Sequence, residues 1–132
     1  MTFASLPGRL AFHAMAALAV AALGHAWPTT SFAAEPGTWA VVGQQGLVRF
    51  VLVPPEQATA QAAYEHQISR LCEPDRTCFL NFYTNSTGAD PAVPLPDAIA
   101  NEATATYRRS MKNGVQVFLW SCRLKLPGRE CF

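Results

Sequence analysis

Residues 47–84 read LVRFVLVPPEQATAQAAYEHQISRLCEPDRTCFLNFYT and contain two strand patterns with a helix pattern between them. Residues 47–53 are β-branched, aromatic or aliphatic apart from one arginine, and Pro54-Pro55 ends this run because proline cannot continue a central strand. Residues 77–84 form a second run of the same kind. The stretch therefore predicts a β-α-β unit.

The segment between the two runs has the spacing of an amphipathic helix. Over residues 56–71 the large apolar side chains are Tyr64, Ile68 and Leu71, which recur at helical intervals. Pro74 disfavours helical geometry in the residue before it, so we expect the helix to end there.

A loop, a second helix and a third strand are predicted after this unit. Residues 85–96 are rich in Ser, Thr, Gly, Asp and Pro, which is typical of a loop. Residues 97–111 repeat the helical spacing up to a stop at Asn113-Gly114, and residues 115–121 (VQVFLWS) have strand character. Residues 39–42, followed by a glycine-flanked turn, are a candidate for one further strand in a hairpin.

This order predicts an α/β (or α+β) domain with a three- to four-stranded β-α-β-α-β sheet. Right-handed crossovers between consecutive parallel strands would place both helices on one face of that sheet. We therefore expect the other face to be covered by the termini or by another molecule, because parallel sheets are generally covered on both sides.

The N-terminal residues 1–33 have the features of a bacterial-type signal peptide. Arg9 supplies a positive start, residues 10–23 are almost wholly apolar, and Ser31-Phe32-Ala33 fits the small-x-small cleavage rule. Cleavage is expected after Ala33, with Ala26 as the alternative. The apolar run of about 14 residues is shorter than the roughly 20 that span a bilayer, so we expect no stable membrane anchor after cleavage.

The charge balance argues against an electrostatic partner. The 132-residue chain has 10 Lys+Arg and 9 Asp+Glu, and removal of Arg9 leaves nine of each sign in residues 34–132. Attraction to nucleic acid or to anionic lipid is therefore not expected. The sequence predicts a single exported domain, residues 34–132, that is periplasmic or secreted.

Four cysteines lie in the predicted exported domain. Cys72 follows the first helix and Cys78 begins the next strand, at one end of the sheet, so we expect these two to pair. Cys122 would then pair with Cys131, which the Pro127-Gly128 turn brings back. Their spacings, with five and eight intervening residues, differ from the roughly two to four of zinc knuckles, so no metal site and no cofactor are predicted.

The uncovered sheet face is the predicted binding surface. Side chains alternate across a strand, and the alternation predicts a helix-covered face that contains Phe50, Leu80 and Val117. Aromatic residues beside arginine are common anchors of interfaces. The opposite face is predicted to present Arg49, Asn81, Tyr83, Gln116, Phe118 and Trp120. The alternative is that this face is a second core layer covered by the protein's own termini.

An enzyme is the second interpretation. A small exported hydrolase or transferase would use the loop 85–97, with Asp90 or Asp97 as acid or base. His66 is the single histidine after cleavage and lies in the middle of a helix, where a solvated position is expected. A nucleophile with its base cannot be assembled from these residues, so a non-enzymatic binding domain with a protein partner is favoured.

A basic cluster and a polar strand end were also considered as sites, and only the cluster is explained by helix electrostatics alone. Arg108, Arg109 and Lys112 fall at the end of the second predicted helix, where cations offset the negative end of the helix dipole. Thr84 and residues 85–87 follow a strand and are a candidate for a small polar pocket at the carboxyl edge of the sheet.

Overall fold

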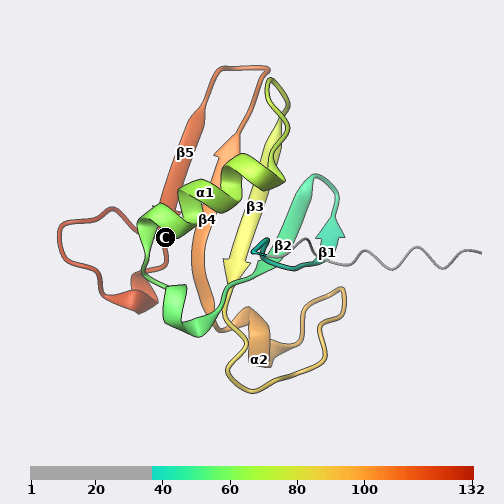
Figure 1. Cartoon of the computed structure of the whole chain (residues 1–132), viewed down its shortest axis with the longest axis vertical. Coiled ribbons are helices and arrows are strands. Elements are labelled where there is room, and N and C mark those ends of the chain that lie inside the picture. The colour runs from blue at the N-terminus through green and yellow to red at the C-terminus, as the bar shows by residue number, and fades with distance from the viewer. Residues whose placement is uncertain (1–36) are drawn as a thin grey trace, which may run out of the picture. The chain divides into compact units, whose positions relative to one another are not determined.

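Five strands form one mixed sheet in the computed structural model, which describes residues 37–132 (Figure 1). Their order in the sheet follows their order in the chain, and β2 and β3 are the parallel pair whereas the other neighbours are antiparallel. The strands are β1 (Val41–Gln45), β2 (Val48–Leu52), β3 (Cys78–Tyr83), β4 (Ala103–Arg109) and β5 (Gln116–Trp120). The predicted signal peptide lies outside the described residues.

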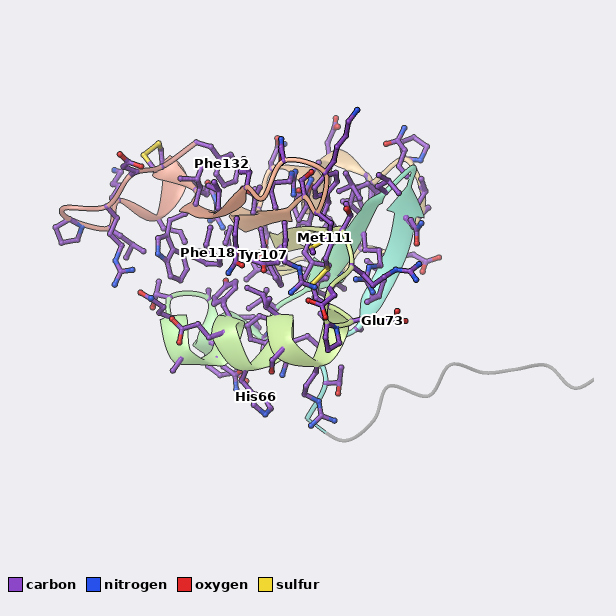
Figure 2. All side chains as sticks on the ribbon, turned by 90° about the horizontal axis from the view of Figure 1, so that it is seen from above. His66, Glu73, Tyr107, Met111, Phe118 and Phe132 are labelled. Carbon is purple, nitrogen blue, oxygen red and sulfur yellow. A yellow bond between two sulfur atoms is a disulfide. The ribbon has the colours of Figure 1, made fainter. Side chains whose placement is uncertain are left out.

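The helix α1 (Gln61–Leu71) connects the parallel strands β2 and β3 and lies across one face of the sheet (Figure 2). The predicted helix over residues 56–71 is therefore confirmed from Gln61 onward. Its first part is instead the 3-10 turn η1 (Pro55–Gln57). Within the described residues, no helix is long and apolar enough to cross a membrane.

The second predicted helix is wrong over most of its length. Only α2 (Asp97–Ala100) is helical, and residues 103–109 form β4. Thr104, Thr106 and Tyr107 are β-branched or aromatic and favour a strand, and β4 gains hydrogen-bonded neighbours on both sides. The domain is therefore α+β with the element order β-β-α-β-α-β-β, and α1 packs on the face of the sheet that carries the main core.

The predicted N-terminal hairpin is present as β1 and β2, but β1 begins at Val41 and continues to Gln45, through most of the residues predicted as the turn. Gly46 in the turn has φ of 59°, a left-handed conformation that glycine adopts without strain. The hairpin places β1 at one edge of the sheet, and β5 forms the other edge.

Tyr64 of α1 lies at the centre of the core. Its ring makes edge contacts with four other rings, at centroid distances of 4.8 Å to Trp39, 5.1 Å to Phe82, 5.6 Å to Phe118 and 5.0 Å to Trp120. Such pairs contribute roughly 0.5–1.5 kcal/mol each beyond the apolar area that they bury. This cluster fixes α1 against β3 and β5.

Both predicted disulfides are present, so the domain is disulfide-stabilised. Cys72–Cys78 joins the end of α1 to the start of β3, with a Cα–Cα distance of 5.7 Å. Cys122–Cys131 joins η2 (Cys122–Leu124), just after β5, to the C-terminal tail, with a Cα–Cα distance of 5.0 Å. Two such bonds indicate an oxidising, exported environment.

Candidate functional site

The structure divides the predicted binding face between the two sides of the sheet. Arg49 is paired with Leu80 and Phe118 with Tyr107, and both partners lie in or beside the core under α1. Arg49, Gln116, Phe118 and Trp120 therefore face the helix, whereas Asn81 and Tyr83 face the opposite way. The prediction of one shared face is wrong, and so is the placement of Phe50 and Val117 on the helix-covered side.

Arg49 has a structural position next to the first disulfide. Its Nη2 donates to the carbonyl oxygen of Leu71 at 2.8 Å and lies 3.1 Å from Sγ of Cys78. The guanidinium thus joins β2 to the end of α1 and to the start of β3. It does not line either cavity described below.

Gln116 and Phe118 lie in a cavity of about 400 Å³ between α1 and the strands β4 and β5. Figure 2 shows Tyr107 and Phe118 directed from the sheet toward the helix. Apolar walls and a polar rim are typical of binding sites. The cavity is lined by Gln61, Tyr64, Glu65, Ile68, Ser69, Tyr107, Arg109, Gln116 and Phe118.

A second cavity of about 330 Å³ continues from the first toward the C-terminal tail. It is lined by Gln61, Phe118, Leu119, Trp120, Arg129 and Glu130. Gln61 and Phe118 belong to both cavities, so the two adjoin. We call the two cavities together the α1–β5 groove.

The edge of β5 beside this groove has outward-directed backbone groups. Ser110 donates to the carbonyl of Val115 at 2.9 Å, and Ser121 donates to the carbonyl of Thr104 at 2.8 Å. These bonds make Ser110–Val115 and Thr104–Ser121 hydrogen-bonded pairs of the antiparallel ladder. Because hydrogen-bonded and non-hydrogen-bonded pairs alternate along such a ladder, Gln116, Phe118 and Trp120 occupy non-hydrogen-bonded positions. Their backbone N–H and C=O groups therefore point away from β4.

The protein's own tail pairs with one end of that edge. The N–H of Phe132 donates to the carbonyl of Trp120 at 3.0 Å, and the N–H of Cys122 donates to the carbonyl of Phe132 at 3.1 Å. Trp120 and Cys131 form a parallel bridge. Figure 1 shows the C-terminus next to β5. Within the described residues, no strand pairs with the outward groups of Gln116 and Phe118.

Polar side chains line the rim of the groove. On the helix side, Gln61 Nε2 donates to Glu65 Oε1 at 2.9 Å. At the far end, Arg109 donates to the carbonyls of Arg76 at 3.0 Å and Glu73 at 2.5 Å. The rim therefore has charges of both signs, which agrees with the nearly neutral composition.

The sheet face opposite α1 has its own polar network around Arg108. Its guanidinium donates to Asn81 Oδ1 at 2.6 Å and to the carbonyl of Leu80 at 2.9 Å, and lies 5.6 Å from the ring centroid of Phe79. Asn81 in turn donates to the hydroxyl of Tyr83 at 3.2 Å. Partial burial lowers the pKa of Arg108.

The explanation of the basic cluster by a helix dipole is wrong, because Arg108 and Arg109 belong to β4. Neighbouring residues of a strand point to opposite faces. Arg108 accordingly lies on the face opposite α1, and Arg109 lies at the groove.

The loop 85–97, which the enzyme hypothesis would use, is held in place by hydrogen bonds between Ser86 and Glu102. Glu102 accepts from the backbone N–H of Ser86 at 2.9 Å and from the Ser86 hydroxyl, and these bonds lower the pKa of Glu102. Asp97 lies in the first turn of α2. Within residues 37–132, no group of three or more potential metal-ligating side chains is present.

His66 lies on the outer face of α1, is exposed, and points away from the sheet (Figure 2). The groove residues Tyr64 and Ile68 lie on the opposite side of the same helix, and Ser69 lies on the flank between the two sides. His66 is therefore placed apart from the groove.

Comparison with protein-family models, with curated proteins and with solved structures found no match to this chain. Its function is therefore inferred from the geometry of the groove.

Proposed function

We propose that this protein is an exported, non-enzymatic interaction module that binds an extended segment of a partner protein along the edge of β5. The observation that supports this function best is the position of the 400 Å³ cavity directly beside outward-directed backbone groups of an edge strand. Such an edge accepts a further strand, with main-chain hydrogen bonds for affinity and alternate side chains for specificity.

The backbone groups of Gln116 and Phe118 would pair with the incoming segment. Because side chains alternate along a strand, every second side chain of that segment would point to the helix side of the sheet and enter the groove. There it would meet the rings of Tyr107 and Phe118 and the side chain of Ile68. A large apolar side chain fits such walls.

The protein's own tail supports an extended occupant over a compact one. Cys131 and Phe132 already pair with the end of the same edge. A partner segment would continue this pairing toward Gln116. The edge geometry thus accommodates a strand next to β5.

The first test uses a displayed library of random linear peptides, screened against the oxidised protein. Enriched peptides are then titrated calorimetrically against Gln116→Pro and Gln116→Ala. Proline is tolerated at an edge but lacks the outward N–H, whereas alanine retains it. We expect Gln116→Pro to bind about tenfold more weakly than Gln116→Ala, because both variants lack the glutamine side chain and only proline lacks the outward N–H.

A second pair of variants tests the groove itself. Ser69→Trp would place a large ring in the cavity from the helix side, and His66→Trp would place the same ring on the face of α1 that points away from the sheet. Binding should be lost in the first variant and retained in the second. Absence of any enriched peptide, or equal binding by all four variants, would overturn the proposal. So would a dimer of this chain that Gln116→Pro dissociates.

A further inference from the structure

Arg129 of the tail closes one end of the α1–β5 groove. Its guanidinium lies 5.6 Å from the ring centroid of Trp120, and Nη1 donates to Oε1 of Gln61 at the start of α1. One side chain thus joins the tail, the edge strand and the helix. The ring beneath it is only 3% exposed.

The two groups that contact Arg129, the Trp120 ring and the Gln61 side-chain oxygen, form a binding site for a cation. The face of an indole ring attracts a guanidinium or ammonium group. Gln61 donates through Nε2 to Glu65, which leaves its Oε1 directed at the cation. Glu130 lines the same 330 Å³ cavity as Arg129, so a carboxylate is part of the cavity lining.

The contacts of Arg129 at this end of the groove are ones that another cation can replace. Arg129 is an exposed residue, and the two groups that it contacts are an uncharged amide oxygen and an aromatic ring. Neither contact is an ion pair. A cation delivered by a partner could therefore replace it without leaving a buried charge unpaired.

We propose that this end of the groove is a subsite for an arginine or lysine side chain of the bound segment, and that Arg129 occupies it until the partner arrives. The inference extends the proposed function, because the subsite lies in the same groove. It assigns a chemistry to the partner: an extended segment with a basic residue near the end that meets the tail.

The test uses N-acetyl-arginine amide as the probe and the uncharged analogue N-acetyl-citrulline amide as its control. Binding is followed by NMR through the indole N–H signal of Trp120 in the wild type, Arg129→Ala and Arg123→Ala. Arg123 is a matched control, because it donates to the carbonyls of Glu102 and Ala103 instead. Removal of the internal competitor should strengthen probe binding by about tenfold in Arg129→Ala alone.

Equal affinity in all three proteins, or equal binding of the citrulline analogue, would overturn the subsite. The two proposals fail separately. If enriched peptides bind in a Gln116→Pro-sensitive way but contain no basic residue and ignore Arg129→Ala, the subsite is wrong and the edge proposal stands. If the arginine probe binds Arg129→Ala but no peptide depends on Gln116, the edge proposal is wrong.

Discussion

The hydroxyl of Tyr64 lies 2.8 Å from the hydroxyl of Thr104, and this hydrogen bond joins the middle of α1 to β4 inside the core. The same phenol donates to the carbonyl of Ala58 at 2.9 Å. Tyr64 and Thr104 are both fully buried. The helix that forms one wall of the groove is thus fixed to the sheet by a buried polar contact as well as by ring packing.

Burial gives this contact a pH dependence. It raises the pKa of Tyr64 from 10.0 to about 12, against the smaller lowering effects of Thr104 and Arg123. The folded protein therefore holds the phenolic proton more tightly than the unfolded chain does. The free energy of unfolding should be unaffected by this group below about pH 10, and should fall by about 3 kcal/mol as the pH rises to about 12.

Urea unfolding at a series of alkaline pH values measures this fall. Tyr64→Phe should lack this contribution, and Tyr83→Phe should retain it. An identical alkaline fall in Tyr64→Phe and the wild type would show that other groups cause it.

Gln67 fixes the start of the described chain to α1. Its Oε1 accepts from the N–H of Trp39 at 2.8 Å, and its Nε2 donates to the carbonyl of Gly37 at 2.6 Å. Gln67→Leu leaves the buried N–H of Trp39 without this partner, so the free energy of unfolding should fall by about 1–3 kcal/mol. Chemical denaturation measures it, with His66→Leu as the exposed neighbour. A loss no larger than that of His66→Leu would contradict the assigned role.

Gly43 and Val93 are coupled by close packing between β1 and the loop that precedes α2. A Cβ at position 43 would lie 2.4 Å from Cγ2 of Val93, too close for either group to stay in place. Gly43→Ala should therefore cost about 1–3 kcal/mol. Val93→Ala shortens the obstructing side chain, so the double variant should recover most of that loss. A double-mutant cycle by denaturation measures the coupling, and additive effects would contradict it.

The β2-α1-β3 unit could be predicted from sequence because its signals are local. Pro54 follows β2 and Pro74 follows α1, so both ends are marked in the sequence. The helical spacing of Tyr64, Ile68 and Leu71 has no competing interpretation. The Cys72–Cys78 pairing follows from the same local order. Residues 97–111 differ, because helical spacing there coincides with a Thr- and Tyr-containing run that forms two ladders once its neighbours are present. Tertiary pairing outweighed the local pattern.

The site was harder to predict because register depends on partners. The run LVRFVLV has apolar side chains at nearly every position, so period-two alternation does not determine which face is buried. Gln116, Phe118 and Trp120 were identified from sequence and do line the groove. Arg109 and Arg129 were not, since the first was assigned to a helix and the second approaches only after the tail folds back. Pairing of Cys122 with Cys131 was the one available signal of that return.

The Cys122–Cys131 disulfide should hold the tail at the edge of β5 as well as stabilise the fold. In the chain-entropy model, removing either short-loop disulfide costs about 2–3 kcal/mol. The double variant Cys122→Ala/Cys131→Ala should in addition free the tail, so that the amides of Cys122 and Phe132 lose protection from hydrogen exchange. Cys72→Ala/Cys78→Ala is the matched control: it should lose similar stability and keep both amides protected under native conditions. If both amides stay protected in Cys122→Ala/Cys131→Ala, backbone hydrogen bonds alone hold the tail against β5. The edge of β5 would then bind an extended segment without a covalent link.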